Sequence, residues 1–245
     1  MRMSVVVCAF NEERLLSGCL HSLLAQTRPP DEVVVVNNAS TDRTAEVAAA
    51  IAGVRVVDEP RKGLVIARET GRSVTSGDLL AYIDADGRAP LFWLERLERR
   101  FARRPDLVGV SGSFRFYDWD LPSRILLRLY DYTVAPATHL LAQRVLRRGA
   151  VFYGGGFCVR RAALDAIGGF DTRIDFHGED TNLGRRLTGV GHVALSNACW
   201  VYTSARRYRA MGRAAVFRLY VRNFWSETMY HRPKDRGHTD VHLQV

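Results

Sequence analysis

Two carboxylates stand one residue apart, Asp84 and Asp86, directly after a mostly apolar run at 79–83. A run of this length, opened by the turn-forming Ser76-Gly77-Asp78, predicts a buried strand that ends at the acids. Ligands of open α/β sheets bind at the carboxyl ends of strands. Adjacent acids repel each other unless a positive group joins them, and magnesium is commonly held by one or two carboxylates together with phosphate oxygens. These residues therefore indicate either a metal site for a phosphate-bearing substrate or a solvated turn with two ordinary acids.

Strands and helices alternate through the first half of the chain. We expect strands at 4–10, 32–36, 54–57, 79–83 and 107–112, and helices that include 15–24, 45–51, 67–71 and 91–101. This alternation predicts βαβ units and a parallel sheet. Right-handed crossovers would bring every carboxyl end to one edge of that sheet. The polar residues that follow the strands would then meet there: Asn11, Glu12, Asn37, Asn38, Asp84 and Asp86.

The second half is less regular. Residues 121–148 predict one or two basic amphipathic helices interrupted at Pro136. Such helices either cover a sheet, the interpretation we favour, or lie on a membrane surface. A strand expected at 151–159 contains three glycines, which permit close approach of a ligand or another backbone. The remaining expected elements are helices at 162–167, from Glu179 onward and at 214–230, and short strands at 193–195 and 200–202.

Helix ends give two further signals. Gly168-Gly169 suits the end of the helix at 162–167. Glu179 and Asp180 fall in the first turn of the next helix, where the helix dipole favours negative charge. Capping is therefore a structural explanation for either acid, although it does not explain why both follow a glycine.

Composition limits the class of protein. The chain has 245 residues, of which 47% are hydrophobic and 25% charged, a profile typical of one folded α/β domain. The net charge of +9 comes almost entirely from arginine, since Lys62 and Lys234 are the only lysines. Arginine favours bidentate contacts with phosphate. Diphosphate substrates, anionic lipid and nucleic acid all fit this charge.

The four cysteines, Cys8, Cys19, Cys158 and Cys199, show no CxxC spacing. We therefore expect no zinc site, and free thiols of a reducing compartment. The N-terminus carries no signal-peptide pattern, and no apolar run approaches the roughly 18 residues of a membrane-spanning helix. These features predict a cytoplasmic protein, with peripheral contact at the inner face of the cell membrane as a further option.

Seven motifs then follow one another along the chain. They are VVCAFNE at 6–12, NNASTD at 37–42, GLVIAR at 63–68, DAD at 84–86, GGFD at 168–171, GED at 178–180 and TSARR at 203–207. In this combination the chain resembles the family 2 glycosyltransferases, which are nucleotide-sugar-dependent enzymes of the GT-A fold, over roughly residues 3–207. The resemblance implies an α/β fold of the GT-A type, a Rossmann-like sandwich with a mostly parallel central sheet.

The resemblance also implies a division of the chain. A single GT-A domain would cover 1–230, with a nucleotide-sugar-binding half at 1–112 and an acceptor half at 113–207. A basic C-terminal helix at 208–230 would complete it, and a flexible tail at 231–245 would follow.

Roles for individual residues come with the resemblance. Asp86 would bind the Mg²⁺ or Mn²⁺ that bridges the diphosphate, Asp84 would contact the ribose or assist with the metal, and Asp180 would take the proton from the acceptor hydroxyl. The residues implied in nucleotide-sugar binding are Ala9, Phe10, Asn11, Glu12, Asn37, Gly63, Arg68, Asp84 and Ala85. Those implied on the acceptor side are Gly155, His177 and Glu179. A single displacement of this kind inverts the anomeric centre without a covalent glycosyl-enzyme.

A UDP-sugar is the expected donor, and a GDP-sugar is the alternative. The family often has an acid at the position of Asn37, where it accepts a hydrogen bond from uracil; asparagine can still accept through its carbonyl. The implied acceptor is a glycan or a lipid-linked molecule in cell-envelope or other glycan or glycolipid synthesis. The basic regions 124–148 and 206–230 are candidates for docking on anionic lipid.

Other functions fit the sequence less well. A nucleotide-sugar-binding or scaffolding module without catalysis is the alternative hypothesis, and the presence of both Asp86 and Asp180 argues against it. A nucleotidyltransferase needs a glycine-rich, lysine-bearing loop after the first strand, and a dinucleotide oxidoreductase needs GxGxxG there. Residues 9–13 provide neither. Nucleic-acid binding rests on charge alone, so we expect no nucleic-acid partner.

Overall fold

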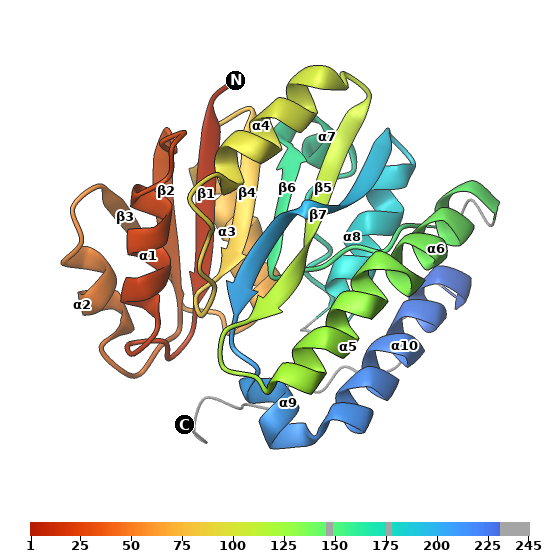
Figure 1. Ribbon diagram of the computed structural model, residues 1–245. Coiled ribbons are helices and arrows are strands. Elements are labelled where there is room, and N and C mark those ends of the chain that lie inside the picture. Colours follow the sequence, from red (N-terminus) through yellow and green to blue (C-terminus); the bar gives the residue numbers. More distant parts are fainter. Residues whose placement is uncertain (146–148, 175–177, 231–245) are drawn as a thin grey trace.

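Seven strands form one mixed sheet in a computed structural model that describes residues 1–145, 149–174 and 178–230 (Figure 1). They are β1 (Met3–Ala9), β2 (Glu32–Asn38), β3 (Val54–Glu59), β4 (Leu79–Asp84), β5 (Leu107–Phe116), β6 (Gly156–Arg160) and β7 (His192–Thr203). Their order across the sheet is β3-β2-β1-β4-β6-β5-β7. The expected α/β architecture with a mostly parallel central sheet is confirmed.

One strand, β6, runs against its neighbours. β1 pairs in parallel with β2 and β4, β2 with β3, and β5 with β7, whereas β6 is antiparallel to both β4 and β5. The carboxyl ends of the parallel strands therefore share one edge with the residues that precede β6. The strand expected at 151–159 is shorter, because the β4–β6 ladder ends where Ile83 lies opposite Gly156 and β4 itself stops at Asp84.

The sheet is buried on both faces. In Figure 1, α1 (Leu16–Leu24) and α4 (Trp93–Arg103) lie on one face, and α3 (Leu64–Val74) lies on the other, with α7 (Arg161–Ala166) and α8 (Glu179–Thr188) further along the sheet. The valines of β1 and β2 alternate between the two cores and are at most 2% exposed: Val5, Val7, Val33 and Val35 on the first face, and Val6, Val34 and Val36 on the second. Continuous apolar runs are typical of parallel strands covered on both sides.

Helix α3 continues beyond its expected end at Gly71 and stops at Val74. A Cβ atom on Gly71 would lie 2.4 Å from Cγ1 of Val6, which is too close for any side chain. Gly71 therefore permits close packing of the helix on β1 rather than ending the helix.

The region 121–148 also differs from expectation. The break falls at Thr133, between α5 (Leu121–Tyr132) and α6 (Val134–Leu140), and Pro136 lies in the first turn of α6. Proline is tolerated there because the first N–H groups of a helix lack helical partners. The two strands expected at 193–195 and 200–202 form one strand, β7, with irregular register against β5. The short helices α2 (Thr44–Ala49) and α9 (Arg206–Met211) complete the links, and α9 was not predicted as a helix separate from the basic C-terminal helix expected at 208–230.

The outer helices leave apolar side chains exposed. α5, α6 with the π-turn η1 (Leu141–Val145), and α10 (Arg213–Tyr230) lie together on one side of the molecule in Figure 1. Their exposed apolar residues include Leu121, Ile125, Leu126, Leu129, Tyr132, Val134, Leu140, Leu141, Val145, Phe217, Trp225 and Tyr230. Among the described residues, no helix combines the length and apolarity that crossing a bilayer requires.

Helix α5 is held to the sheet through one buried acid, Asp131. Its side chain is 1% exposed and its Oδ1 accepts a hydrogen bond from the Tyr153 hydroxyl at 3.3 Å, while Asn197 Nδ2 donates to its backbone carbonyl at 2.7 Å. Burial raises the pKa of Asp131 to about 6, against the Tyr153 hydrogen bond and the charges of Arg128 and Arg115.

We expect Asp131 to make the protein less stable as pH rises. The folded-state pKa of Asp131 lies above its ordinary value of 3.8. The protonated side chain therefore stabilises the folded state fully below pH 3.8, and this stabilisation is lost as pH rises through about 6. A shift of this size corresponds to about 2–3 kcal/mol. Urea unfolding of the parent and of Asp131→Asn from pH 4 to pH 8 should therefore show a flatter profile for the variant. The exposed Asp106→Asn is the control, and parallel profiles for the parent and Asp131→Asn would contradict the assignment.

Candidate active site

Asp84 stands at the carboxyl end of β4, beside a buried arginine. Its side chain is 45% exposed, and its Oδ1 lies 3.7 Å from Nη2 of Arg68. Its backbone N–H donates to the carbonyl of Gly155 at 3.3 Å. Desolvation by the surrounding protein raises the pKa of Asp84 to about 6, the charge of Arg68 opposes this rise, and the charge of Asp86 adds to it. A cation placed between the two acids would relieve that repulsion.

Asp86 is held by residues from the far end of the chain. Its Oδ1 accepts a hydrogen bond from the Thr203 hydroxyl at 3.2 Å, and its Oδ2 lies 3.3 Å from Nη2 of Arg206. The same guanidinium donates to both carboxylate oxygens of Glu12. Burial raises the pKa of Glu12 to about 7, and the hydrogen bonds and charge of Arg206 oppose that rise. One cation on α9 is therefore shared by the acid after β4 and the acid after β1.

The loops after β1 and β2 are joined through Asn11. Asn11 adopts a positive φ of 53°, which asparagine tolerates better than most residues. Its Oδ1 accepts a hydrogen bond from the Thr41 backbone N–H at 2.9 Å, and its own N–H donates to Ser40 Oγ at 3.1 Å. These bonds fix the two loops as one surface next to Glu12.

Asn37, at the end of β2, keeps an unused acceptor. Its Nδ2 donates to Asp58 Oδ1 at 2.8 Å. An ionised carboxylate only accepts hydrogen bonds, so the NH₂ group of Asn37 has to face Asp58. The opposite atom, Oδ1, is buried and has no hydrogen-bond partner among the residues that the structure describes. That oxygen can accept a hydrogen bond from a ligand.

The remaining residues expected beside the nucleotide lie along the same edge. The Gly63 backbone N–H donates to Asn38 Oδ1 at 2.8 Å, and Lys62 Nζ lies 4.0 Å from the ring centroid of Phe10. Ala9 closes β1 and Ala85 separates the two acids, and both are buried.

A second pair of acids lies on the other side of Arg68. Glu179 and Asp180 begin α8, behind Gly178, which adopts a left-handed conformation. Glu179 Oε1 lies 3.3 Å from Nη1 of Arg68. Burial and the neighbouring charge of Asp180 raise the pKa of Glu179 to about 7, and burial also raises the pKa of Asp180. Arg68, 3% exposed, thus joins the acid of β4 to the acids of α8.

Two glycines bring these groups together. A Cβ on Gly155 would lie 2.7 Å from Asp84 Oδ2 and 2.7 Å from the ring of Phe114. A Cβ on Gly154 would lie 3.2 Å from both Arg68 Nη2 and Glu179 Oε1, and the Gly154 carbonyl accepts a hydrogen bond from Arg68 at 2.8 Å. The atoms nearest to these two Cβ positions are thus side-chain atoms, among them the carboxylates of Asp84 and Glu179, and not another backbone.

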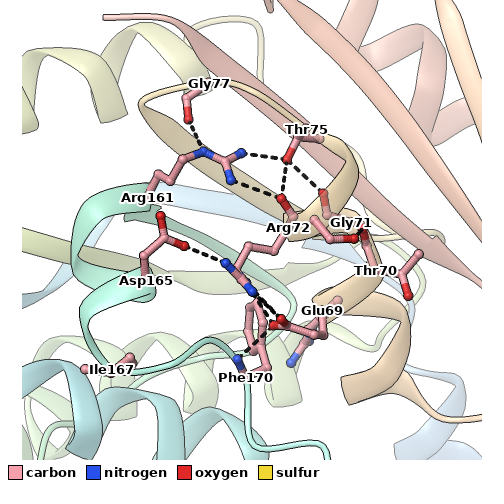
Figure 2. A network of polar contacts seen from close by, with 12 residues as sticks. Glu69, Thr70, Gly71, Arg72, Thr75, Gly77, Arg161, Asp165, Ile167 and Phe170 are labelled. Carbon is pink, nitrogen blue, oxygen red and sulfur yellow. Dashed lines mark hydrogen bonds and ion pairs between the residues drawn. The ribbon is translucent and has the colours of Figure 1, made fainter.

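Figure 2 shows how α3 holds the segment that leads to α8. Arg72 binds Glu69 on its own helix and Asp165 on α7, the latter at 2.5 Å, and Glu69 accepts the backbone N–H of Phe170 at 3.0 Å. Arg161 donates to the carbonyls of Gly77 and Arg72. Gly168 and the following glycine have positive φ values of 75° and 77°, as their expected role at the end of the preceding helix requires. One face of α3 thus presents Arg68 to the site while the next residue anchors the 168–171 motif.

Sequence reasoning missed the contribution of α9. Arg206 binds Glu12 and Asp86, and Arg207 donates to the Tyr220 hydroxyl at 3.0 Å. Burial acts to lower the pKa of Arg207, but Tyr220, Asp84 and Glu179 outweigh it and the pKa is raised. The signal in the sequence was the pair of arginines directly after a strand end, in the motif at 203–207. His177 and the tail at 231–245 lie outside the described residues.

The site is rich in charge but not built as a complete metal cage. Within the described ranges, no three His, Cys, Asp or Glu side chains converge as they would around a metal ion held by protein alone. Asp84 and Asp86 offer two carboxylates, which is the protein donor set of a magnesium or manganese ion completed by substrate phosphates. The residues present therefore fit such an ion.

Comparison with known proteins identifies the chemistry of related chains. The family model described as "Glycosyl transferase family 2" matches residues 4–168. The "Glucosyl-dolichyl phosphate glucuronosyltransferase" of Haloferax volcanii is 28% identical over 185 residues, which are 73% of this chain and 59% of that protein. The chain thus spans about three fifths of the length of this curated relative.

Two solved structures share the fold. The mannosyltransferase PcManGT from Pyrobaculum calidifontis in complex with GDP-Man and Mn²⁺ aligns with a TM-score of 0.68 and 22% identity, over 90% of this chain and 64% of that one. Glucosyl-3-phosphoglycerate synthase from Mycobacterium tuberculosis, in complex with Mn²⁺, UDP and phosphoglyceric acid, aligns with a TM-score of 0.62 and 21% identity, over 92% and 76%. The expected GT-A-type fold is confirmed.

Proposed function

The chain belongs to glycosyl transferase family 2, and on that basis we propose that it transfers a sugar from a nucleoside diphosphate sugar to an acceptor hydroxyl. We propose further that the transfer inverts the anomeric centre and depends on Mg²⁺ or Mn²⁺. The observation that supports this best is the meeting of Asp84, at the end of β4, and Glu179, at the start of α8, around the buried guanidinium of Arg68. Donor and acceptor groups would react between them.

We assign the donor to residues 1–112 and the acceptor to residues 113–207. Asn11, Glu12, Gly63 and Arg68 would line the nucleotide, in keeping with their common edge. The unused Oδ1 of Asn37 can accept the imide N–H of uracil, so a UDP-sugar is the proposed donor. PcManGT binds GDP-Man, which keeps a GDP-sugar as the alternative to be tested.

Asp86 would hold the metal ion, and Asp84 would contact the ribose or share the ion. When bound, the ion would neutralise negative charge on the leaving diphosphate. Arg206 already neutralises Asp86 and Glu12, and its guanidinium can turn to a diphosphate oxygen because Arg–phosphate pairs are geometrically favourable. Arg207, on the same helix, adds a second positive charge near Asp84.

Asp180 is the proposed general base. Its raised pKa makes it a stronger proton acceptor than an exposed aspartate, while the nearby charge of Arg68 favours its ionised form. Glu179, paired with Arg68, would orient the acceptor side rather than accept the proton. The acceptor itself is proposed to be a glycan or a lipid-linked molecule, and the free cysteines suit a reducing, cytoplasmic compartment.

The test combines donor binding with turnover. Thermal shift with a panel of nucleotide sugars and Mn²⁺ should find a stabilising donor, and EDTA should abolish both the shift and sugar transfer. Asp86→Asn should weaken Mn²⁺-dependent UDP binding about tenfold or more, since a charge-assisted contact is worth about 1.5–3 kcal/mol. The exposed Asp106→Asn is the control. Nucleotide binding without hydrolysis or transfer would instead favour a binding module without catalysis.

We also propose peripheral contact with anionic membrane through α5, α6 and α10, where exposed apolar residues alternate with arginine. Basic amphipathic surfaces bind anionic lipid through both kinds of side chain. The protein should float with phosphatidylserine-containing vesicles at low salt and less so at high salt. Absence of flotation at low salt would refute membrane contact without touching the proposed reaction.

A further inference from the structure

A cavity of about 240 Å³ lies between α5 and the ends of β5 and β7. Three arginines, Arg115, Arg124 and Arg128, contribute to its wall. The rest is apolar or aromatic: Phe114, Phe116, Leu121, Ile125, Leu127 and Tyr202. None of the residues to which the donor site is assigned lines this cavity, which we call the α5 groove.

The arginines of the α5 groove lack anionic partners. Arg115, Arg124 and Arg128 form no ion pair with any residue in the described ranges, whereas Arg68, Arg72 and many other arginines of the chain are paired. The guanidinium Cζ of Arg115 lies 3.4 Å from the centroid of the Trp200 ring, and the Arg115 Nε is buried without a hydrogen-bond acceptor in the described structure.

The α5 groove therefore brings three positive charges together in a partly buried site. Burial lowers the pKa of Arg115, and the charge of Arg128 lowers it further. The charges of Arg115 and Arg128 both act on the pKa of Asp131. Its carboxylate, however, accepts a hydrogen bond from the Tyr153 hydroxyl and not from either arginine. A buried donor without a partner costs free energy, which a bound anion would recover. Guanidinium groups recognise phosphate in particular.

The same groove continues into an apolar surface. Leu121 and Ile125 line it and remain 65% and 60% exposed, and Leu126 and Leu129 lie next to them on α5 at 68% and 60%. A small anion such as free phosphate would leave this surface in water. An anion that carries a hydrocarbon chain would cover it, and burial of apolar area would add to its affinity.

The side chain of Phe114 separates the α5 groove from the proposed reaction centre. The ring of Phe114 lines the groove, and its far edge occupies the space beside Gly155, against which Asp84 also lies. Tyr202 lines the groove as well, and the next residue, Thr203, binds Asp86. A molecule anchored here can therefore extend toward the acids without crossing the surface assigned to the nucleotide.

We propose that the α5 groove binds the phosphate or diphosphate group of a lipid-linked acceptor, with Arg115, Arg124 and Arg128 around the anion and the exposed leucines of α5 on the start of the hydrocarbon chain. This proposal rests on the proposed function and names the class of its acceptor. The sugar-accepting hydroxyl of such a molecule would extend past Phe114 toward Asp180.

The first experiment measures binding of a simple amphiphile by isothermal titration calorimetry, below its critical micelle concentration. Dodecyl phosphate should bind saturably, and dodecyl maltoside, which has the same chain and no charge, should not. The double variant Arg115→Gln/Arg128→Gln should weaken dodecyl phosphate binding by about tenfold or more. Arg124→Gln, which alters an exposed side chain and should not affect folding, is expected to weaken it in the same direction. Arg103→Gln, an exposed arginine on α4, is the control.

Trp200 reports the location of binding. An anion that draws Arg115 from the indole should change the Trp200 fluorescence, and Trp200→Phe should remove that change while calorimetric binding persists. Inorganic phosphate should compete weakly, because it lacks the chain. Phosphatidylserine vesicles that bind the parent and the Arg115→Gln/Arg124→Gln/Arg128→Gln variant equally would assign any bilayer contact to residues outside the α5 groove.

Three results would overturn the proposal: no saturable binding of dodecyl phosphate, equal binding of dodecyl maltoside, or unchanged binding in both arginine variants. UDP binding with Mn²⁺ is measured on the same samples and should not change in any of them. Normal UDP binding with no dodecyl phosphate binding refutes the groove alone, whereas loss of UDP binding in the parent refutes the proposed function.

Discussion

Replacement of Asp180 by asparagine is expected to lower sugar transfer by about 10²–10⁴-fold, the usual contribution of a positioned general base. Asparagine keeps the shape of the side chain and can still accept from the Thr181 N–H, a bond of 2.7 Å in the parent. It cannot take a proton from the acceptor. The loss should therefore appear in kcat, with the melting temperature and the Mn²⁺-dependent affinity for UDP close to those of the parent.

Glu179→Gln is the matched control for this experiment. Glu179 neighbours Asp180, is likewise partly buried and also has a raised pKa, at about 7. Its proposed role is to pair with Arg68, so the variant should alter the acceptor KM and the stability more than kcat. A large fall in kcat in Glu179→Gln, with near-normal kcat in Asp180→Asn, would transfer the role of base to Glu179.

Replacement of Arg68 by methionine is expected to destabilise the fold by about 3–5 kcal/mol, the cost of removing one partner from a buried ion pair. Arg68 is 3% exposed and lies between Asp84 and Glu179 at 3.7 Å and 3.3 Å. Methionine fills much of the same volume but leaves both carboxylates without the cation that pairs with them. Chemical unfolding at pH 8 measures the difference directly.

The cost of Arg68→Met should fall with pH. The pKa values of Asp84 and Glu179, about 6 and about 7 with Arg68 present, rise further when its charge is removed. Below pH 6 both acids can therefore take up protons, and as neutral groups they no longer need a cation beside them. Arg72→Met is the control, because its partners Glu69 and Asp165 are partly exposed and such pairs contribute about 0–1 kcal/mol. Equal destabilisation by both variants, or no dependence on pH, would contradict this account of Arg68.

Local signals in the sequence were sufficient for the half of the chain that carries the proposed donor site. Apolar runs that end in Asn11, Asn37 and Asp84 predicted three parallel strands with polar residues at one edge, and the structure has them there. The reason is that all the signals are local. The apolar run that predicts a strand buried on both faces and the polar residue that follows the strand are neighbours in the sequence.

Long-range partners could not be predicted in this way. Arg206 binds Glu12 across 194 positions of sequence, and the motif at 203–207 does not indicate which acids its arginines contact. The antiparallel direction of β6 was equally hidden, because direction depends on where the chain returns and not on the composition of a strand. Pro136 misled for a different reason: proline breaks a helix interior but fits a first turn, and the first turn was not recognised.

The reversed strand β6 has a consequence for how the chain tolerates changes in length. With its five residues β6 pairs with both β4 and β5, and Gly154 and Gly155, which directly precede it, lie beside Arg68 and Asp84. A one-residue insertion between Gly155 and Arg160 would exchange the faces of Phe157 and Cys158, which lie in opposite cores. The turn between α5 and α6, at the exposed Thr133, can by contrast lengthen into solvent. Insertions that leave the proposed donor site undisturbed should therefore be found at this turn and be absent from 154–160.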